Sequence, residues 1–331
     1  MTTEQTQLTA GGHEETRAGV EGAAGGHEEV PVSREGTPAG VEEIPAGHGK
    51  VPAGHDETPG PVLDITGLEV HYGLGRRRRR ALHDVSLSVQ PGETIGVIGE
   101  TGSGKSTLAR AVLGLVPASA GSIRIGGEDV SGYGRRQWRG LRRRGVIQYV
   151  FQDPLRSLDP DLTIEDSLTE PLLVQGVPRQ EAAARARTFL DRVRLTADLL
   201  DRLPGELSGG QRQRVSVARA LVTEPKLVIL DEPVSALDSA NRVQVLEILK
   251  ELRADGVALV FISHDLGSIA GTADRIAVLY QGELVEVGAA RDVITRPQHV
   301  YTRLLVSSAP TLRTSPVGRA EREALRALLN A

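Results

Sequence analysis

The chain has 331 residues, of which 39% are hydrophobic and 25% are charged, a balance that is ordinary for a soluble protein. It contains no cysteine, which excludes disulfides, thiol catalysis and cysteine-ligated metal clusters and fits a cytosolic chain. No apolar run approaches the roughly 18 to 20 residues that span a bilayer. The first residues, MTTEQTQLTAGG, lack the basic and apolar regions of a secretory signal, so we expect none.

The net charge of −4 is unevenly distributed along the chain. Residues 1–60 hold 11 acidic and three basic residues, so the remainder is mildly basic. An excess this small does not indicate nucleic acid as a partner. The most basic stretches are Arg76–Arg80 and Arg135–Arg144. They would face either anionic lipid or phosphate, although such runs are more often solvated loops.

Residues 1–60 are predicted to form a disordered acidic tail. They are rich in glycine, glutamate, alanine and proline, and loosely repeated units such as GGHEE and PAGHDET cannot bury a core. Four of the eight histidines lie in this tail: His13, His27, His48 and His55. They would bind a transition metal only loosely, because they are widely spaced and separated by glutamates. An inert tail is therefore the preferred interpretation.

From Pro61 onward the pattern changes to alternating strands and helices. In chain order we expect strands at 62–72, 81–89 and 93–98, a helix at 106–115, a mostly helical region at about 155–205, a helix at 210–221, a strand at 227–230, a helix at 240–254 and strands at 257–262 and 275–280. Alternation of this kind favours a parallel sheet with helices on both faces.

A phosphate-binding loop is expected directly after the strand at 93–98. The sequence GETGSGKS fits the pattern G-x-x-x-x-G-K-[ST] between a strand and a helix. Its glycines let backbone N–H groups surround a polyphosphate, and the following helix adds about half a positive charge at its N-terminus. Lys105 supplies a charge for the β- and γ-phosphates, and Ser106 a hydroxyl ligand for Mg²⁺. The predicted nucleotide-binding residues of this segment are Gly99, Glu100, Thr101, Gly102, Ser103, Gly104, Lys105, Ser106 and Thr107.

Two acids, Asp231 and Glu232, follow the four aliphatic residues of the strand at 227–230. A buried strand delivers them at the carboxyl edge of the sheet, where open α/β sheets bind ligands. We expect Asp231 to hold Mg²⁺ through its coordination shell. We expect Glu232 to orient and deprotonate the attacking water. Four aliphatic residues before an acid are common, so this assignment depends on the phosphate loop.

A second candidate anion site begins at Leu207. In the run LSGGQ, two glycines after a serine would expose backbone N–H groups at a helix N-terminus. With this run, the chain resembles the ATP-binding subunits of ABC transporters over roughly residues 62–310. The resemblance implies that the active unit is a head-to-tail dimer with two sandwiched ATPs. The residues that would act on the ATP of the opposite subunit are Leu207, Ser208, Gly209, Gly210 and Gln211.

The resemblance also implies the fold class, which is α/β. It comprises a P-loop NTPase (RecA-like) core, an antiparallel β subdomain and an inserted helical subdomain at about residues 155–205. The ATPase domain would cover residues 61–310. It would follow the tail at 1–60 and precede a short C-terminal extension at 311–331.

Further residues match motifs of the same family, each with an implied role. Tyr72 matches the aromatic residue that stacks on adenine, and Gln152 matches the loop glutamine that reaches Mg²⁺ and water. Asp238, in Ser235–Asp238, matches the loop that contacts the partner subunit. His264 matches the switch histidine that senses the γ-phosphate. The implied catalytic residues are Glu232, His264 and Gln152, and the implied Mg²⁺ ligands are Ser106, Gln152 and Asp231.

Three segments resemble the dipeptide, oligopeptide and nickel importer branch of the family. They are Phe151–Leu172, Asp231–Asp238 and the tail His299–Leu305, in which Val300 replaces a proline. Many members of this branch hold an iron–sulfur cluster through cysteines in that tail, which this chain lacks. The sequence QYVFQDPL, which starts at Gln148, resembles the second, F-type ATPase subunit of such importers.

The resemblance implies an ATP- and Mg²⁺-dependent subunit that energises import of peptides or a related small solute. Its implied partners are a second ATPase subunit, two membrane permease subunits and an extracytoplasmic solute-binding protein, at the cytoplasmic face of the cell membrane. Two alternatives remain, namely the ATPase of an exporter and a soluble ABC protein that acts on ribosomes or DNA. The sequence does not identify the cargo or decide between a homodimer and a heterodimer, and it gives the tail no function.

Overall fold

The structure is a computed structural model, and it describes residues 60–73, 79–153, 157–235 and 237–309, together with residues 325, 328 and 329. All of these belong to one compact unit, Asp56–Ala331. The expectations for the tail at residues 1–59 and for Arg76 to Arg78 therefore lie outside the described residues, as does most of the extension at 311–331.

The central element is a six-stranded sheet with the strand order β10-β9-β3-β8-β7-β6. The strands β9, β3, β8, β7 and β6 are all parallel to one another, whereas β10 is antiparallel to β9. This arrangement confirms the parallel sheet expected from the sequence. The strands are β3 (Thr94–Ile98), β6 (Ile147–Val150), β7 (Leu227–Asp231), β8 (Ala258–Ser263), β9 (Arg275–Tyr280) and β10 (Glu283–Ala289).

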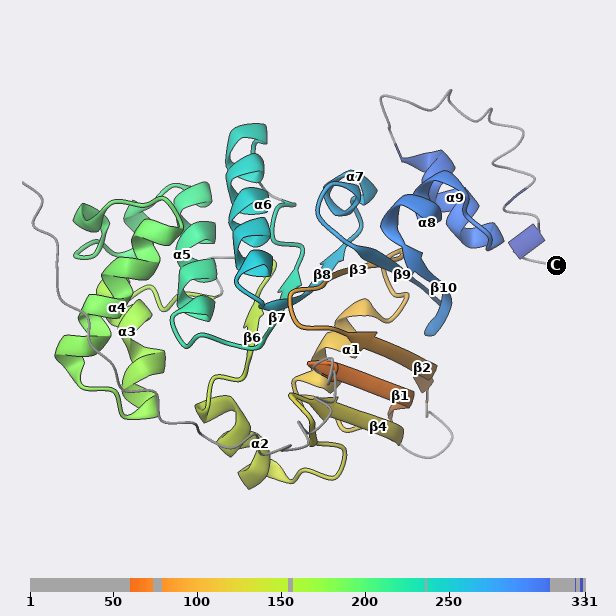
Figure 1. Cartoon of the computed structure of the whole chain (residues 1–331), viewed down its shortest axis with the longest axis horizontal. Helices are drawn as coiled ribbons and strands as arrows, with labels where there is room; N and C mark the ends of the chain where they lie inside the picture. Colours follow the sequence, from red (N-terminus) through yellow and green to blue (C-terminus); the bar gives the residue numbers. More distant parts are fainter. Residues whose placement is uncertain are drawn as a thin grey trace, which may run out of the picture. The chain divides into compact units, whose positions relative to one another are not determined.

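A second, antiparallel sheet has the strand order β2-β1-β4-β5. Its strands are β1 (Leu63–Tyr72), β2 (Arg79–Val89), β4 (Ala120–Ile125) and β5 (Glu128–Asp129). Helix α1 (Lys105–Val112) follows β3 and packs near β2, as Figure 1 shows. The antiparallel β subdomain implied by the family resemblance is therefore present.

Helices α3 (Ile164–Gln175), α4 (Arg179–Arg192) and α5 (Gly209–Leu221) pack against one another (Figure 1). Helix α3 begins where the Thr163 hydroxyl accepts a hydrogen bond from the amide of Asp166 at 3.1 Å, and it ends at Gly176, whose φ is +92°. Short 3₁₀ turns, η3 (Ala197–Leu199) and η4 (Pro204–Glu206), connect α4 to α5. The remaining helices are α2 (Arg135–Arg143), α6 (Ser239–Ala254), α7 (Leu266–Ala270), α8 (Ala290–Thr295) and α9 (Val300–Ser308).

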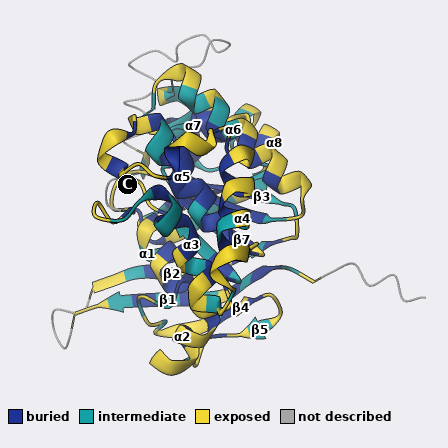
Figure 2. Cartoon of the chain, turned by 90° about the vertical axis from the view of Figure 1, so that its left-hand side faces the viewer, coloured by how far each residue is buried: buried dark blue, intermediate teal, exposed yellow. Residues whose placement is uncertain are grey.

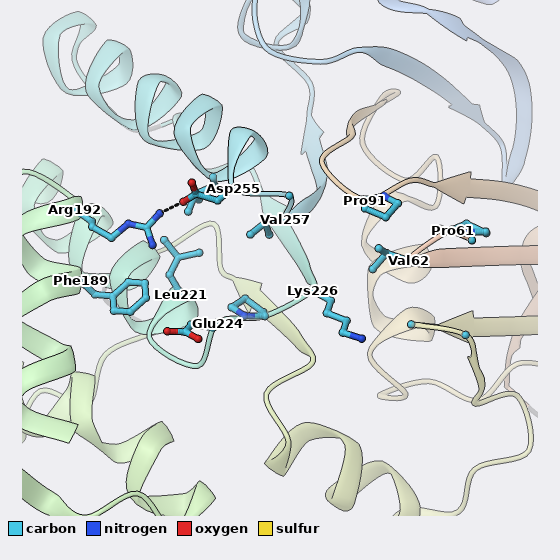
Figure 3. A pocket seen from close by; sticks show the side chains of 16 residues that line it. Pro61, Val62, Pro91, Phe189, Arg192, Leu221, Glu224, Lys226, Asp255 and Val257 are labelled. Carbon is cyan, nitrogen blue, oxygen red and sulfur yellow. Dashed lines mark hydrogen bonds and ion pairs between the residues drawn. The ribbon is translucent and has the colours of Figure 1, made fainter. Parts of the chain in front are cut away.

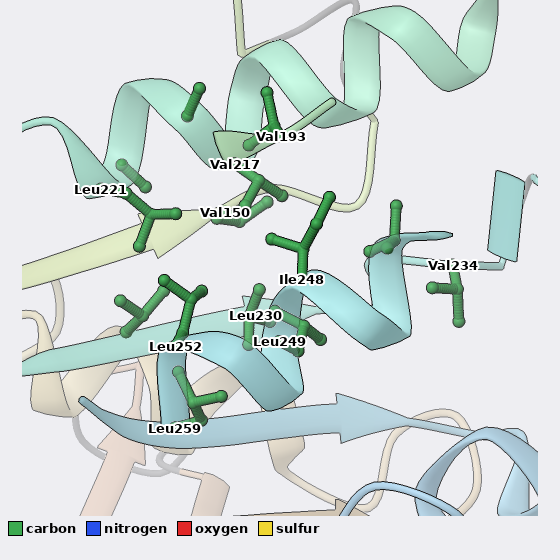
Figure 4. Packing of buried hydrophobic residues seen from close by; sticks show 14 of the residues in the cluster. Val150, Val193, Val217, Leu221, Leu230, Val234, Ile248, Leu249, Leu252 and Leu259 are labelled. Atoms are coloured by element: carbon green, nitrogen blue, oxygen red, sulfur yellow. The ribbon is translucent and has the colours of Figure 1, made fainter. Parts of the chain in front are cut away.

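The parallel sheet separates two hydrophobic cores, because successive side chains of a strand point to opposite faces. In β7, Leu227 and Ile229 pack with the antiparallel sheet and α1, whereas Val228 and Leu230 pack with α5 and α6. Figure 4 shows the second core, and Figure 2 shows α5 as largely buried. A strand covered on both faces is held firmly, so the residues at its carboxyl end have well-defined positions.

Candidate active site

The phosphate loop curls tightly at the carboxyl end of β3. Gly99 and Gly104 have φ values of +157° and +113°, which side-chain-bearing residues rarely adopt. A Cβ atom on Gly99 would lie 2.2 Å from the carbonyl oxygen of Leu279, and one on Gly104 would lie 2.9 Å from the Leu82 side chain. Glycine is therefore required at both positions for the loop to fit between β2 and β9.

Lys105 lies inside this loop with only 8% of its surface exposed. Its Nζ donates to the carbonyl oxygens of Gly99 at 2.6 Å and Glu100 at 2.9 Å. Burial lowers the pKa of Lys105, and the negative charges of Glu232, Asp231 and Glu100 oppose that effect. The loop thus holds a cation next to the two acids that the sequence singled out.

Asp231 ends β7 and is paired with a tyrosine of the neighbouring strand. The hydroxyl of Tyr149 donates to Oδ2 of Asp231 at 2.6 Å. Burial, and then the hydrogen bond to Asp231, raise the pKa of Tyr149 well above its usual value. Tyr149 therefore remains a hydrogen-bond donor and fixes one oxygen of the carboxylate.

Glu232 is held by two side chains that the sequence assigned to the same site. Nε2 of Gln152 donates to Oε2 at 2.8 Å, and Nδ1 of His264 lies 2.7 Å from Oε1. Because a carboxylate only accepts, the ring donates from Nδ1. The backbone of Glu232 has a φ of +50°, an unusual value for a residue with a side chain. Strain of this kind is concentrated at functional sites.

These groups surround a cavity of about 870 Å³, a volume suited to a nucleotide-sized ligand. Tyr72 lies at its rim, where its hydroxyl is 3.4 Å from Oγ1 of Thr107. The sequence-predicted residues that line the cavity are Tyr72, Thr101, Gly102, Gly104, Lys105, Ser106, Thr107, Gln152, Asp231 and Glu232. His264 is joined to them through Glu232.

Several residues of the cavity wall were not identified from the sequence. Arg79, Arg80 and His83 come from β2, and Gln281 comes from the turn between β9 and β10. Arg80 pairs with Glu69 at 3.4 Å. The arginine run was visible in the sequence, but its place beside the phosphate loop depends on how β2 packs. No spacing rule reveals that position.

The LSGGQ run is not part of this cavity in the described structure. Ser208 caps helix α5, because its hydroxyl accepts from the amide of Gln211 at 3.2 Å and the Gln211 side chain accepts from the amide of Ser208 at 2.8 Å. The other predicted members of the run (Leu207, Gly209 and Gly210) and Asp238 are likewise absent from the lining residues. Asp238 instead caps α6 by accepting from the amide of Asn241 at 2.9 Å.

A separate pocket of about 640 Å³ lies at the opposite side of the sheet, where the parallel strands begin (Figure 3). It is lined by residues that precede strands, including Pro91 before β3, Lys226 before β7 and Val257 before β8. Arg192 and Asp255 form an ion pair at its side. Open α/β sheets bind ligands at the carboxyl ends of their strands, so this pocket is not the candidate nucleotide site.

A glycine-rich loop with a buried lysine after β3, together with two acids at the end of β7 in the same sheet, defines a P-loop ATPase. The sequence profile of the ABC transporter family matches residues 82–235. The chain is also 43% identical over 268 residues to a putative peptide import ATP-binding protein of Brucella ovis, an alignment that covers 80% of this chain and 83% of that protein. The chain belongs to the ABC transporter family, as an ATP-binding subunit that hydrolyses ATP.

Two further comparisons agree with this assignment. The glutathione import ATP-binding protein GsiA of Escherichia coli K12 is 44% identical over 264 residues, which cover 77% of this chain but only 42% of GsiA. The dimeric, post-hydrolysis structure of the ATP-binding cassette MJ0796 bound to ADP and Pi has a TM-score of 0.64 and 30% identity. That match covers 69% of this chain and 99% of MJ0796. The similarity to MJ0796 confirms the fold, and the two import proteins belong to the peptide importer branch.

Proposed function

We propose that this chain is the ATPase subunit of an importer for peptides or a related small solute. The observation that carries the catalytic assignment is the position of Glu232, between Gln152 and His264 at the wall of the loop cavity. The named importers among the relatives support the direction of transport. Hydrolysis at this site would supply the free energy for movement of separate membrane subunits.

Catalysis in this proposal uses electrostatics and one general base. Backbone N–H groups of the loop and the ammonium of Lys105 bind the phosphate oxygens. Glu232 accepts a proton from the attacking water, and the hydrogen bonds from Gln152 and His264 fix both of its oxygens. Since these two donors come from different strand ends, a displacement of either one misorients the base. Tyr72 would stack on the adenine.

The residues proposed to hold Mg²⁺ supply only oxygen donors, which this cation prefers. Tyr149 occupies Oδ2 of Asp231, so Oδ1 is the oxygen left for a cation or its water. The amide nitrogen of Gln152 donates to Glu232, which leaves its carbonyl oxygen as a ligand. Ser106 adds a hydroxyl at the cavity wall. When bound, Mg²⁺ would neutralise charge on the phosphate oxygens.

The LSGGQ run supports a composite site formed with a second ATPase subunit. Within one chain it lies outside the nucleotide cavity, and its residues form the first turn of α5, the end of a helix at which anions bind. We propose that Leu207–Gln211 contact the ATP of a partner subunit and that Asp238 lies at the same interface. The resemblance of Gln148–Leu155 to the F-type subunit favours a heterodimer.

A hollow of about 270 Å³ supports docking of the permease beside the helical region. It lies between β6, α3 and α5, and the exposed Phe151 forms part of its wall. Phe151 immediately precedes Gln152, so docking here would act close to the catalytic base. Among the described residues no helix is both long and apolar enough to cross a membrane. We propose separate permease subunits, a peripheral position on the cytoplasmic face of the membrane, and an extracytoplasmic solute-binding protein.

The decisive experiment compares Glu232→Gln with the unmodified chain. The glutamine keeps the shape of the side chain but removes the base, so we expect nucleotide binding to persist and hydrolysis to fall by about 10² to 10⁴. Glu181→Gln, on the exposed face of α4, is the matched control and should hydrolyse ATP normally. Hydrolysis by Glu232→Gln at the unmodified rate would refute the site. Isolation of the intact membrane complex would identify the partner subunits and any bound solute.

A further inference from the structure

Helix α9, near the end of the chain, contacts the phosphate loop directly. Tyr301, in the first turn of α9, is buried with 1% of its surface exposed. Its hydroxyl accepts a hydrogen bond from the backbone amide of Glu100 at 2.8 Å. The two residues are 201 positions apart in the chain, so the contact exists only in the folded protein.

Helix α9 is fixed at the same end that carries Tyr301. The carboxylate of Glu286 on β10 accepts from the amides of Gln298 and His299, both at 2.9 Å. Nδ1 of His299 then accepts from the amide of Tyr301 at 3.2 Å, which caps the helix. The ring of Tyr301 packs on that of Tyr280 with centroids 4.2 Å apart. The hydroxyl is therefore held in place from several sides.

We propose that Tyr301 is a positioning residue, which holds the phosphate loop in the conformation that binds nucleotide. This inference rests on the proposed assignment of Gly99–Thr107 as the phosphate-binding segment. Glu100 lies at the start of that segment, before the residues that line the cavity. Tyr301 thus acts through the loop backbone and has no direct contact with the phosphates in this role.

The physical basis is the pairing of one amide. Burial raises the pKa of Tyr301 to about 12, so the phenol stays neutral at physiological pH and its hydrogen bond does not titrate away. Without the hydroxyl, the amide of Glu100 loses its hydrogen-bond acceptor. Loop conformations in which that amide donates to water then become more stable relative to the binding conformation. Nucleotide affinity then falls in proportion to the fraction of loops that keep the binding conformation.

Two neighbouring tyrosines provide a matched pair of variants. Tyr301→Phe removes the hydroxyl that touches the loop and keeps the ring. Tyr280→Phe removes a hydroxyl from the packed ring next to it, where the phenol oxygen accepts from the exposed side chain of Gln281 at 3.0 Å. The two changes delete the same atom from the same cluster, so a difference between them reports the contact with Glu100.

Nucleotide affinity is measured with ATP and Mg²⁺ by calorimetry, with Glu232→Gln present in each chain to prevent turnover. We expect Tyr301→Phe to raise the Kd by about three- to tenfold, while Tyr280→Phe stays within about twofold. In chains with intact Glu232, kcat at saturating ATP should be unchanged and KM should rise. A Kd for Tyr301→Phe that matches Tyr280→Phe, or a loss confined to kcat, would overturn the proposal.

Two additional measurements separate the possible failures. Hydrogen exchange of the Glu100 amide in the unmodified chain should be slow, and rapid exchange would overturn the proposal without any variant. Lys105→Ala should lose nucleotide binding. If Lys105→Ala binds nucleotide normally, the assignment of the phosphate loop itself is wrong. If Lys105→Ala loses nucleotide binding but Tyr301→Phe binds nucleotide as tightly as the unmodified chain, only the role of Tyr301 is refuted.

Discussion

Tyr149 and Asp231 lie on adjacent parallel strands, and the hydroxyl of Tyr149 donates to Oδ2 of Asp231 at 2.6 Å. The phenol ring also packs edge-on against Phe151, with ring centroids 4.6 Å apart. The carboxylate proposed to face Mg²⁺ is therefore oriented by a side chain that itself has little freedom to move.

Removal of this hydroxyl should weaken the response to Mg²⁺. In Tyr149→Phe the charged carboxylate of Asp231 loses the hydroxyl that donates to it, so the carboxylate can rotate away from the cavity. We expect the Mg²⁺ concentration for half-maximal ATP hydrolysis to rise by about three- to tenfold. Tyr133→Phe, whose hydroxyl bonds to Glu128 outside the cavity, is the control. Equal Mg²⁺ dependence in both variants would contradict the orienting role.

The two glycines of the LSGGQ run should differ in their tolerance of alanine. A Cβ atom on Gly210 would lie 2.3 Å from the side chain of Asn241, whereas one on Gly209 would have no atom within 4 Å. We expect Gly210→Ala to lose about 1–3 kcal/mol of unfolding free energy by overpacking, and Gly209→Ala to lose much less. Urea denaturation of both variants provides the comparison. Equal stability of the two would show that Asn241 moves aside freely.

The cap formed by Asp238 predicts a specific dependence of stability on pH. Hydrogen bonds from the amide and then the side chain of Asn241 lower the pKa of Asp238 below its ordinary value of 3.8. The cap therefore contributes fully above about pH 3.8 and is lost as the pH falls through the lower folded-state value. We expect Asp238→Ala to lower the melting temperature at neutral pH, by an amount that shrinks below pH 3.8.

Asp238→Asn is the matched control for that measurement, since asparagine caps helices about as well without a charge. The melting temperature of Asp238→Asn at neutral pH should be close to that of the unmodified chain. A deficit in Asp238→Ala that stays constant through the acid range would mean that the lost stability does not come from the ionised cap.

The sequence predicted the parts of the fold and site that depend on local pattern. The loop from Gly99 and the acids Asp231 and Glu232 were recognisable because their spacing and flanking strands are characteristic. Helix α2 was not predicted, because arginines occupy most of its positions and only Trp138 and Leu141 are buried. The helix expected at 106–115 ends earlier, at Val112, because the chain turns at Gly114 with a φ of +64°.

The contacts that arrange the site could not be predicted in the same way. Tyr149 and Tyr301 look like ordinary apolar positions in a strand and a helix, and their hydroxyl partners are 82 and 201 residues distant in the chain. Such pairs depend on strand order and helix packing, which a single sequence does not specify.

The side chain of Asn241 has a consequence for assembly. It donates to Oδ2 of Asp238 at 2.7 Å and lies against Gly210, so it ties the start of α6 to the first turn of α5. The two segments proposed to meet a second subunit therefore share one rigid support before any encounter. An ordered surface forfeits less conformational entropy on association than a flexible one. We expect the rate of pairing between subunits to be governed by diffusion and orientation, with no slow rearrangement of this surface.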